Sequence, residues 1–205
     1  MVDKKQAESI AKNIVKKVLK DNKLLSELIK GVASKDDSIR YPNAIALEIL
    51  SNEHPEMIYP EWDFFIDLLN RRNAYSKSIA IKTIANLTSV DIEDRFENIF
   101  NEYYNELNDK SVIVARQLAI NSGKIAKAKP KLQTKITNKL LSIDETNHNP
   151  NRKDLIKGDI IKAFSEYFEE IENKKEIIKF VKKQLKSTSP STLKKVKEFL
   201  KRWEN

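Results

Sequence analysis

One apolar pattern returns four times along this chain of 205 residues, and it limits the fold more than any other feature. In each copy, small and large apolar residues fall at steps of three and four, which places them on one face of an α-helix. A basic residue stands near the start of each copy. The intervals between these basic residues are 37, 39 and 41 positions, and the residues are Arg40, Lys77, Arg116 and Lys157. A helical pattern that returns about every forty residues predicts a repeat protein.

The four copies approximate one template, and each carries a small residue on this face, such as Ala46, Ala80, Ala119 and Ala163. Small residues on a helix face allow a neighbouring helix to approach closely. The copies comprise Ile39, Asn43, Ala46, Leu47 and Leu50; Ser76, Ala80, Thr83, Ile84 and Leu87; Ala115, Ala119, Ser122, Gly123 and Ala126 or Ile125; and Ile156, Ile160, Ala163, Phe164 and Tyr167. A degenerate fifth copy comprises Leu193, Val196, Phe199, Leu200 and Trp203.

Each copy follows another amphipathic segment, so the predicted unit is a helix, a turn and a second helix. The fold class that this predicts is all-α, with roughly three quarters of the residues helical, and a right-handed α-solenoid of about five antiparallel helix pairs. We expect one domain over residues 1–205. Its predicted parts are an N-terminal helix at 5–20 and repeats at about 23–52, 60–88, 92–128, 130–172 and 174–203. The segment 52–60, with a proline near each end, is predicted to be a loop.

Two stretches resemble a known family. IRYPNAIALEIL (39–50) and VARQLAINSGKIA (114–126) are similar to the second helix of HEAT repeats, and the resemblance extends over about residues 23–172. It implies stacked helix pairs, and it implies that the basic position bonds a turn carboxylate. The carboxylates nearby in sequence are Asp36, Asp37, Asp109 and Asp154. A 34-residue tetratricopeptide period fits less well, and armadillo units of three helices stay open for parts of the chain.

The composition gives little support to catalysis. The chain has no cysteine, which excludes disulfides and thiolate metal sites. Three scattered glycines cannot form a glycine-rich phosphate loop. The two histidines, His54 and His148, stand in predicted loops without a second ligand at helical spacing, so we interpret them as structural. We therefore expect no catalytic residue, no metal site, no cofactor and no enzymatic activity.

The formal net charge of +8 is unevenly distributed. Counted by segment it is +5 over residues 1–35, −3 over 36–150 and +6 over 151–205. A basic excess can attract nucleic acid or acidic partners, although lysine is also the common solubilising residue of exposed helix faces. No window approaches the ~20 apolar residues of a membrane span. We expect a cytoplasmic protein that does not bind a membrane.

Seven basic residues are the candidate binding site. They are the basic position of each copy together with lysines five or eight residues further on, which the helical period places on the same side. We name these residues the basic stripe: Arg40, Lys77, Lys82, Arg116, Lys124, Lys157 and Lys162. In an α-solenoid this side lines the concave face. The carboxylates Glu48, Glu166 and Glu198 dilute it.

The repeat pattern and the basic stripe suggest two functions. The first is a non-enzymatic HEAT-like scaffold that binds a protein or peptide on the concave face. The alternative is a nucleic-acid-binding HEAT-like protein, related to the alkylpurine DNA glycosylases. Those enzymes imply aromatic and acidic residues in a basic cleft, whereas the two tryptophans here, Trp62 and Trp203, occupy a predicted core position and the chain end.

Overall fold

The computed structural model describes residues 3–172 and 174–204. Helices, α and 3-10 together, make up 84% of these residues, and no strand occurs among them. The predicted all-α class is therefore confirmed. No helix in the described residues is long and apolar enough to cross a membrane.

The chain groups into two compact units, Met1–Val90 and Asp91–Asn205. The boundary falls between the predicted repeats 60–88 and 92–128. The prediction of one domain over the whole chain stays a prediction, and each unit is described by itself below.

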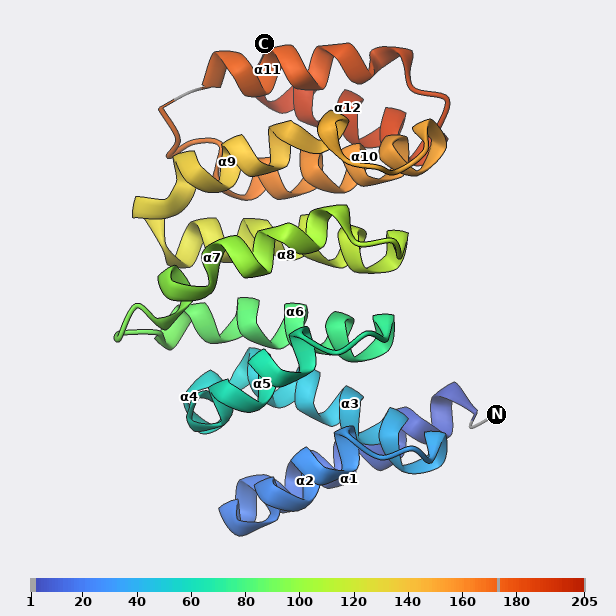
Figure 1. Cartoon of the computed structure of the whole chain (residues 1–205), viewed down its shortest axis with the longest axis vertical. Coiled ribbons are helices and arrows are strands. Elements are labelled where there is room, and N and C mark those ends of the chain that lie inside the picture. Colours follow the sequence, from blue (N-terminus) through green and yellow to red (C-terminus); the bar gives the residue numbers. More distant parts are fainter. Residues whose placement is uncertain (1–2, 173, 205) are drawn as a thin grey trace. The chain divides into compact units, whose positions relative to one another are not determined.

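In the first unit, α3 is the central helix. It packs against α1, α2 and α6, and α5 covers α6 (Figure 1). The first two copies of the apolar pattern therefore lie on neighbouring helices, α3 and α6. The α-helices of this unit are α1 (Lys4–Lys20), α2 (Leu25–Val32), α3 (Asp37–Glu53), α4 (Pro55–Ile58), α5 (Trp62–Leu69) and α6 (Ala74–Leu87).

The prolines of the first unit lie in helical structure, one inside α3 and two in first turns. Pro42 lies inside α3, which begins at Asp37 because the Asp36 carboxylate accepts the Ser38 N–H at 2.8 Å. The loop predicted at 52–60 is wrong. Pro55 opens α4, and a 3-10 turn, Tyr59–Glu61, joins it to α5. A proline in the first helical turn sacrifices no intrahelical hydrogen bond, so Pro55 and Pro60 are tolerated, whereas Pro42 in the second turn of α3 has no N–H to donate to the Ser38 carbonyl.

In the second unit, α10 packs between α8 and α12. The third, fourth and fifth copies of the pattern therefore lie side by side. The α-helices of this unit are α7 (Arg95–Asn105), α8 (Val112–Ala128), α9 (Gln133–Leu141), α10 (Pro150–Tyr167), α11 (Lys174–Lys183) and α12 (Pro190–Trp203).

The first helix of the second unit begins later than its apolar pattern, because Asp91 caps it. The Asp91 carboxylate accepts the backbone N–H groups of Arg95 at 2.9 Å and Phe96 at 3.0 Å. Asp94, just before α7, has a left-handed backbone with φ of 53°. Ile92, which precedes the helix, is exposed.

The cores of both units contain the repeated pattern. Copies two, three and four are buried at every position of the pattern. In the first copy Ala46, Leu47 and Leu50 are buried, but Ile39 is 48% exposed and Asn43 is half-buried. Ile39 lies on the first turn of α3.

Candidate binding surface

The residues of the basic stripe lie on α3, α6, α8 and α10, the helices of the four copies. Three belong to the first unit and four to the second, so each unit carries its own part. On α3 the residue is Arg40; on α6, Lys77 and Lys82; on α8, Arg116 and Lys124; on α10, Lys157 and Lys162.

Arg40 is held by the turn that precedes α3. It forms an ion pair with Asp37, and its Nη1 donates to the Ser34 carbonyl at 3.3 Å. Its guanidinium lies 4.7 Å from the ring centre of Tyr75 on α6. The pairing with a turn carboxylate that the resemblance implies is present here. Burial raises the pKa of the Tyr75 phenol, although the Arg40 charge opposes the shift.

Lys82 on α6 links this helix to α3. Its ammonium pairs with Glu48 of α3 at 3.0 Å. Lys77 is half-buried one turn earlier on α6. Deeper between the same helices, the Asn86 amide donates to the Ser51 hydroxyl at 3.0 Å. Positive and negative side chains therefore meet where α3 and α6 pack together.

A buried carboxylate organises the stripe in the second unit. Asp159 on α10 is only 2% exposed at its side chain. Its Oδ2 accepts from Arg116 Nε on α8 at 2.6 Å, and its Oδ1 accepts from Lys195 Nζ on α12 at 2.6 Å. One anion thus pairs with two cations, and Arg116 is neutralised as it reaches the surface. Charge-assisted bonds of this kind are short and strong.

Lys157 pairs with a carboxylate other than the one expected. Its ammonium lies 2.6 Å from Asp144, in the 3-10 turn that follows α9. Asp154 instead accepts the backbone N–H groups of Thr188 and Ser189, both at 3.1 Å, and so holds the turn before α12. Asp109 likewise accepts the Ser111 N–H at 2.7 Å, at the start of α8. The short-range partners suggested for Arg116 and Lys157 are therefore wrong, because those carboxylates cap turns.

Lys124 and Lys162 lie beside an acidic residue as well. Burial raises the pKa of Glu166 above its ordinary value, and the charges of Lys162, Lys127 and Lys124 oppose that rise. Glu166 lies close to the α8 backbone because residue 123 is glycine. A Cβ there would fall 2.6 Å from Glu166 Oε2 and 3.0 Å from the Ala163 carbonyl oxygen. The end of the stripe on α8 and α10 is therefore of mixed charge.

The sequence identified the cations of the basic stripe but not two of the carboxylates that pair with them, Asp144 and Asp159, nor Lys195, the second cation on Asp159. The pairing partners of Arg116 are distant in sequence, and only the fold brings them together. One signal was available. Asp159 stands among apolar residues of the fourth copy, one residue before Ile160, where a carboxylate needs a partner to be buried.

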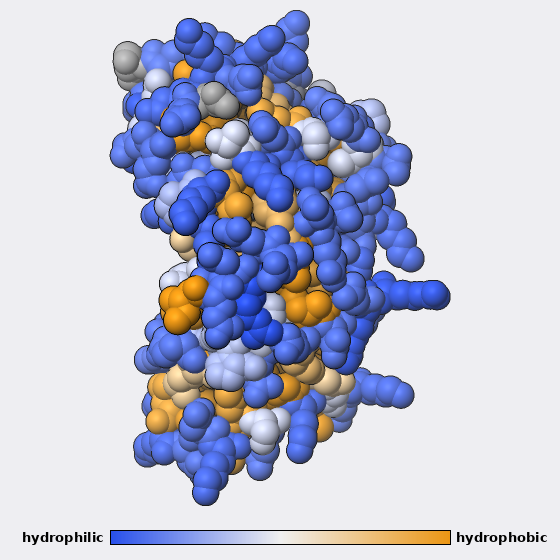
Figure 2. Space-filling view, turned by 60° about the vertical axis from the view of Figure 1, so that its left-hand side comes forward, coloured by the Kyte–Doolittle hydropathy of each residue, from blue (hydrophilic) through white to orange (hydrophobic). Residues whose placement is uncertain are grey.

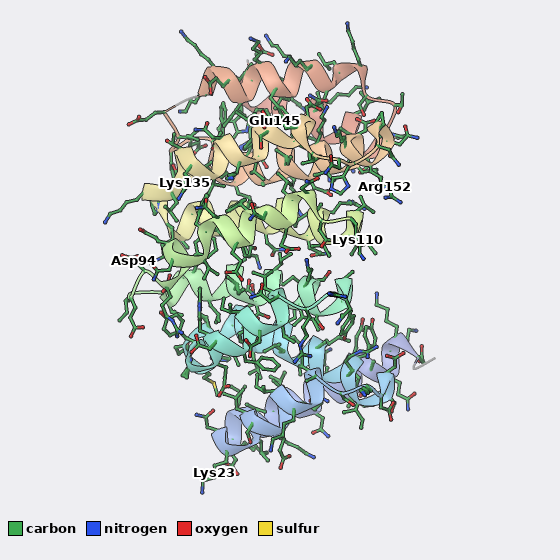
Figure 3. The ribbon with its side chains drawn as sticks, viewed as in Figure 1. Lys23, Asp94, Lys110, Lys135, Glu145 and Arg152 are labelled. Atoms are coloured by element: carbon green, nitrogen blue, oxygen red, sulfur yellow. The ribbon has the colours of Figure 1, made fainter. Side chains whose placement is uncertain are left out.

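A further run of lysines at the α8–α9 junction also makes internal contacts. Lys129 pairs with Asp91 at 3.1 Å and with Asp94 at 2.6 Å. Burial lowers the pKa of Lys129, but these two carboxylates outweigh it and the net shift is upward. Lys135 on α9 lies 4.0 Å from the ring centre of Phe100. Asp94 and Lys135 are labelled in Figure 3.

The histidines have structural surroundings. His148 is buried, and its Nε2 lies 3.0 Å from the Leu107 carbonyl oxygen. His54 ends α3, with Nδ1 at 3.6 Å from Glu56. Within residues 3–172 and 174–204, no group of three or more His, Asp or Glu side chains is arranged to hold a metal ion. An open hollow of about 260 Å³ beside the end of α7 includes Lys139 and Glu145 in its wall, and Glu145 is labelled in Figure 3.

The outward side of α11 forms a second hollow, open to solvent, of about 560 Å³. It is lined by Lys175, Ile178, Lys179, Lys182 and Lys183. None of these residues belongs to the basic stripe. On the face shown in Figure 2, hydrophilic residues cover most of the surface and apolar residues show between them.

Comparisons with known proteins bear on the fold alone. No protein-family model matches the chain, and no curated protein matches it. The crystal structure of an engineered protein is similar, with a TM-score of 0.53 and 16% sequence identity, over 96% of this chain and 88% of that chain. At this identity the likeness describes the path of an all-α chain and carries no function.

Proposed function

We propose that the chain is a non-enzymatic HEAT-like scaffold that binds a protein or peptide on the side formed by its second helices. The proposal includes the finer fold prediction of a right-handed α-solenoid of about five antiparallel helix pairs. Its support is the side-by-side packing of α3 with α6 in the first unit and of α8, α10 and α12 in the second. Stacked helix pairs offer extended surfaces suited to polypeptide ligands.

The observation that carries the proposal is the alternation of charge along the basic stripe. Lys82 lies against Glu48, and Lys157 lies against Asp144, and both carboxylates are exposed. A phosphate backbone favours a continuous positive surface, because each contact replaces a condensed counterion. Paired charges at a surface instead favour a partner whose own charges alternate, since such pairs fix register and exclude wrong partners. The stripe therefore favours a polypeptide over nucleic acid.

Site-specific crosslinking tests this proposal. A photoreactive amino acid at Lys162, exposed on α10, is activated in native lysate, and the adducts are analysed by mass spectrometry with and without nuclease. The matched control carries the same group at Lys131, which is exposed in the 3-10 turn before α9. We expect discrete protein adducts at position 162 that are missing at position 131. Adducts that nuclease removes, or the same adducts at both positions, would contradict the proposal.

A further inference from the structure

The net positive charge of the chain resides in its last helix pair. Between Lys174 and Trp203 there are eleven Lys and Arg residues and two Asp and Glu residues, a net charge of +9, whereas the whole chain carries +8. The rest of the chain is thus close to neutral. The wider segment 151–205 carries only +6, because the acidic end of α10 and the turn after it offset part of the charge.

On α11 the charge occupies one face. Ile177, Phe180 and Val181 are buried toward the rest of the second unit. The opposite face, which we name the lysine face, carries five exposed lysines: Lys175, Lys179, Lys182, Lys183 and, in the following 3-10 turn, Lys186. At 1.5 Å per residue they extend over roughly 16 Å. Figure 1 shows α11 at the edge of its unit, with α12 beside it.

The lysine face differs from the basic stripe in its pairing. Lys182 forms an ion pair with Glu204. For Lys175, Lys179, Lys183 and Lys186, no carboxylate of the described residues lies within ion-pair distance. Four of the five lysines therefore keep their charge available, whereas Arg40, Lys82, Arg116 and Lys157 are each paired.

We propose that the lysine face of α11 binds the phosphate backbone of duplex nucleic acid without sequence preference. Lysine suits this ligand, because a flexible ammonium contacts phosphate as a point charge. Regularly spaced cations over roughly 16 Å face several phosphates at once, since duplex DNA carries a negative charge about every 1.7 Å of its axis. The proposal goes beyond the scaffold function and uses a different surface.

Two other anionic partners fit this face less well. The core of a protein interface is depleted in lysine and enriched in aromatic residues and arginine, and the lysine face carries no aromatic residue. A helix that lies in a membrane surface inserts apolar side chains between the lipids. Here Ile178 is half-buried among lysines, and Leu185 in the following 3-10 turn is a single exposed apolar side chain, too few for such an insertion.

The test is a fluorescence anisotropy titration of the full chain with a random-sequence duplex of about 20 base pairs at several salt concentrations. The variant carries Lys175→Gln, Lys179→Gln and Lys183→Gln. The control carries Lys12→Gln, Lys16→Gln and Lys20→Gln on α1, which are also exposed and remove the same charge. We expect the α11 variant to bind the duplex at least about tenfold more weakly at low salt. The slope of the logarithm of the association constant against the logarithm of the salt concentration should also fall in magnitude by about two to three.

Three results would overturn the proposal. They are no duplex binding by the wild-type chain at about 50 mM salt, an equal loss in the α1 control, and a duplex affinity that does not change with salt. Binding of the chain to vesicles of phosphatidylserine and phosphatidylcholine is measured in parallel. Retention on these vesicles at a salt concentration that releases the duplex would assign the lysine face to anionic lipid instead. Circular dichroism of each variant confirms that the helices are intact.

Discussion

Asp159 on α10 receives Arg116 from α8 on one carboxylate oxygen and Lys195 from α12 on the other, each at 2.6 Å. The carboxylate is buried, whereas both cations reach solvent. Removing the anion therefore leaves two cations without their partner, although water can reach each of them.

We predict that Asp159→Asn lowers the free energy of unfolding by about 1–3 kcal/mol. Breaking a buried pair by removing one partner costs about 3–5 kcal/mol, and the exposure of the cations reduces that figure. Urea denaturation followed by circular dichroism measures the change. The matched control is Glu198→Gln, which breaks the exposed pair with Lys194 on α12 and should cost less than about 1 kcal/mol. If the two variants lost the same free energy of unfolding, Asp159 would not have the central role described here.

Glu166 should make the stability of the chain depend on pH in a particular direction. Its pKa is raised in the folded state mainly by burial, so folding favours the protonated form. The favourable contribution is complete below the unfolded pKa and is lost as the pH rises through the folded pKa. Glu166→Gln, which cannot ionise, should therefore stabilise the chain at pH 7 and lose this advantage below about pH 4.

Thermal unfolding of wild type and Glu166→Gln across this pH range measures the difference. The exposed Glu169→Gln serves as control and should show no such pH-dependent gain. A Glu166→Gln variant that is less stable than wild type at pH 7 would show that the lysines around Glu166 outweigh its burial.

The buried tyrosines should resist ionisation. Burial raises the pKa of Tyr103, Tyr104 and Tyr167, and Tyr104 and Tyr167 also bond Ser122 and Thr137. We expect these three phenols to remain neutral in the native chain at a pH at which exposed tyrosines, with an ordinary pKa near 10, have ionised. Ultraviolet absorbance during an alkaline titration counts the ionised phenols. Because folding favours the neutral phenols, their ionisation at high pH should lower the free energy of unfolding. If all three tyrosines ionised near pH 10 in the native chain, the prediction would be wrong.

Lys129 should stabilise the entry to α7 through its two carboxylates. Lys129→Met keeps the length of the side chain and removes its charge, so Asp91 remains buried without its cation. We expect a loss of about 1–3 kcal/mol in the free energy of unfolding. The control, Lys131→Met, changes an exposed lysine of the same junction and should have little effect. If the two variants were equally stable, the Lys129 ion pairs would be of no consequence for folding.

The helices were predictable from the sequence because their signal is local. The second copy, from Ser76 to Leu87, lies within α6, and the degenerate fifth copy, from Leu193 to Trp203, lies within α12. The helix α4 was missed, since Pro55 was interpreted as a breaker although proline is tolerated in a first turn. The late start of α7 depends on the Asp91 cap, which its apolar pattern does not reveal.

The candidate site was less predictable, because its partners are distant in sequence. Helical spacing identified Arg116 and Lys82 as members of one row. It could not show that Asp159, 43 residues after Arg116, is the partner of that arginine, or that Glu48 lies against Lys82. Neutralisation of a cation is a property of tertiary packing, and only the neighbouring helix supplies the anion.

The shared carboxylate of Asp159 has a consequence for cooperativity. In the second unit α10 packs between α8 and α12, so α12 lies at the edge of this row of helices, and an edge helix is the first part expected to fray. Lys195 fastens α12 to the same anion that Arg116 reaches from α8. Detaching α12 would expose Asp159 to water and weaken the hold on α8 at the same time. Local opening at the C-terminal end should therefore spread through α10 to α8, so that these three helices exchange their amide hydrogens as one unit.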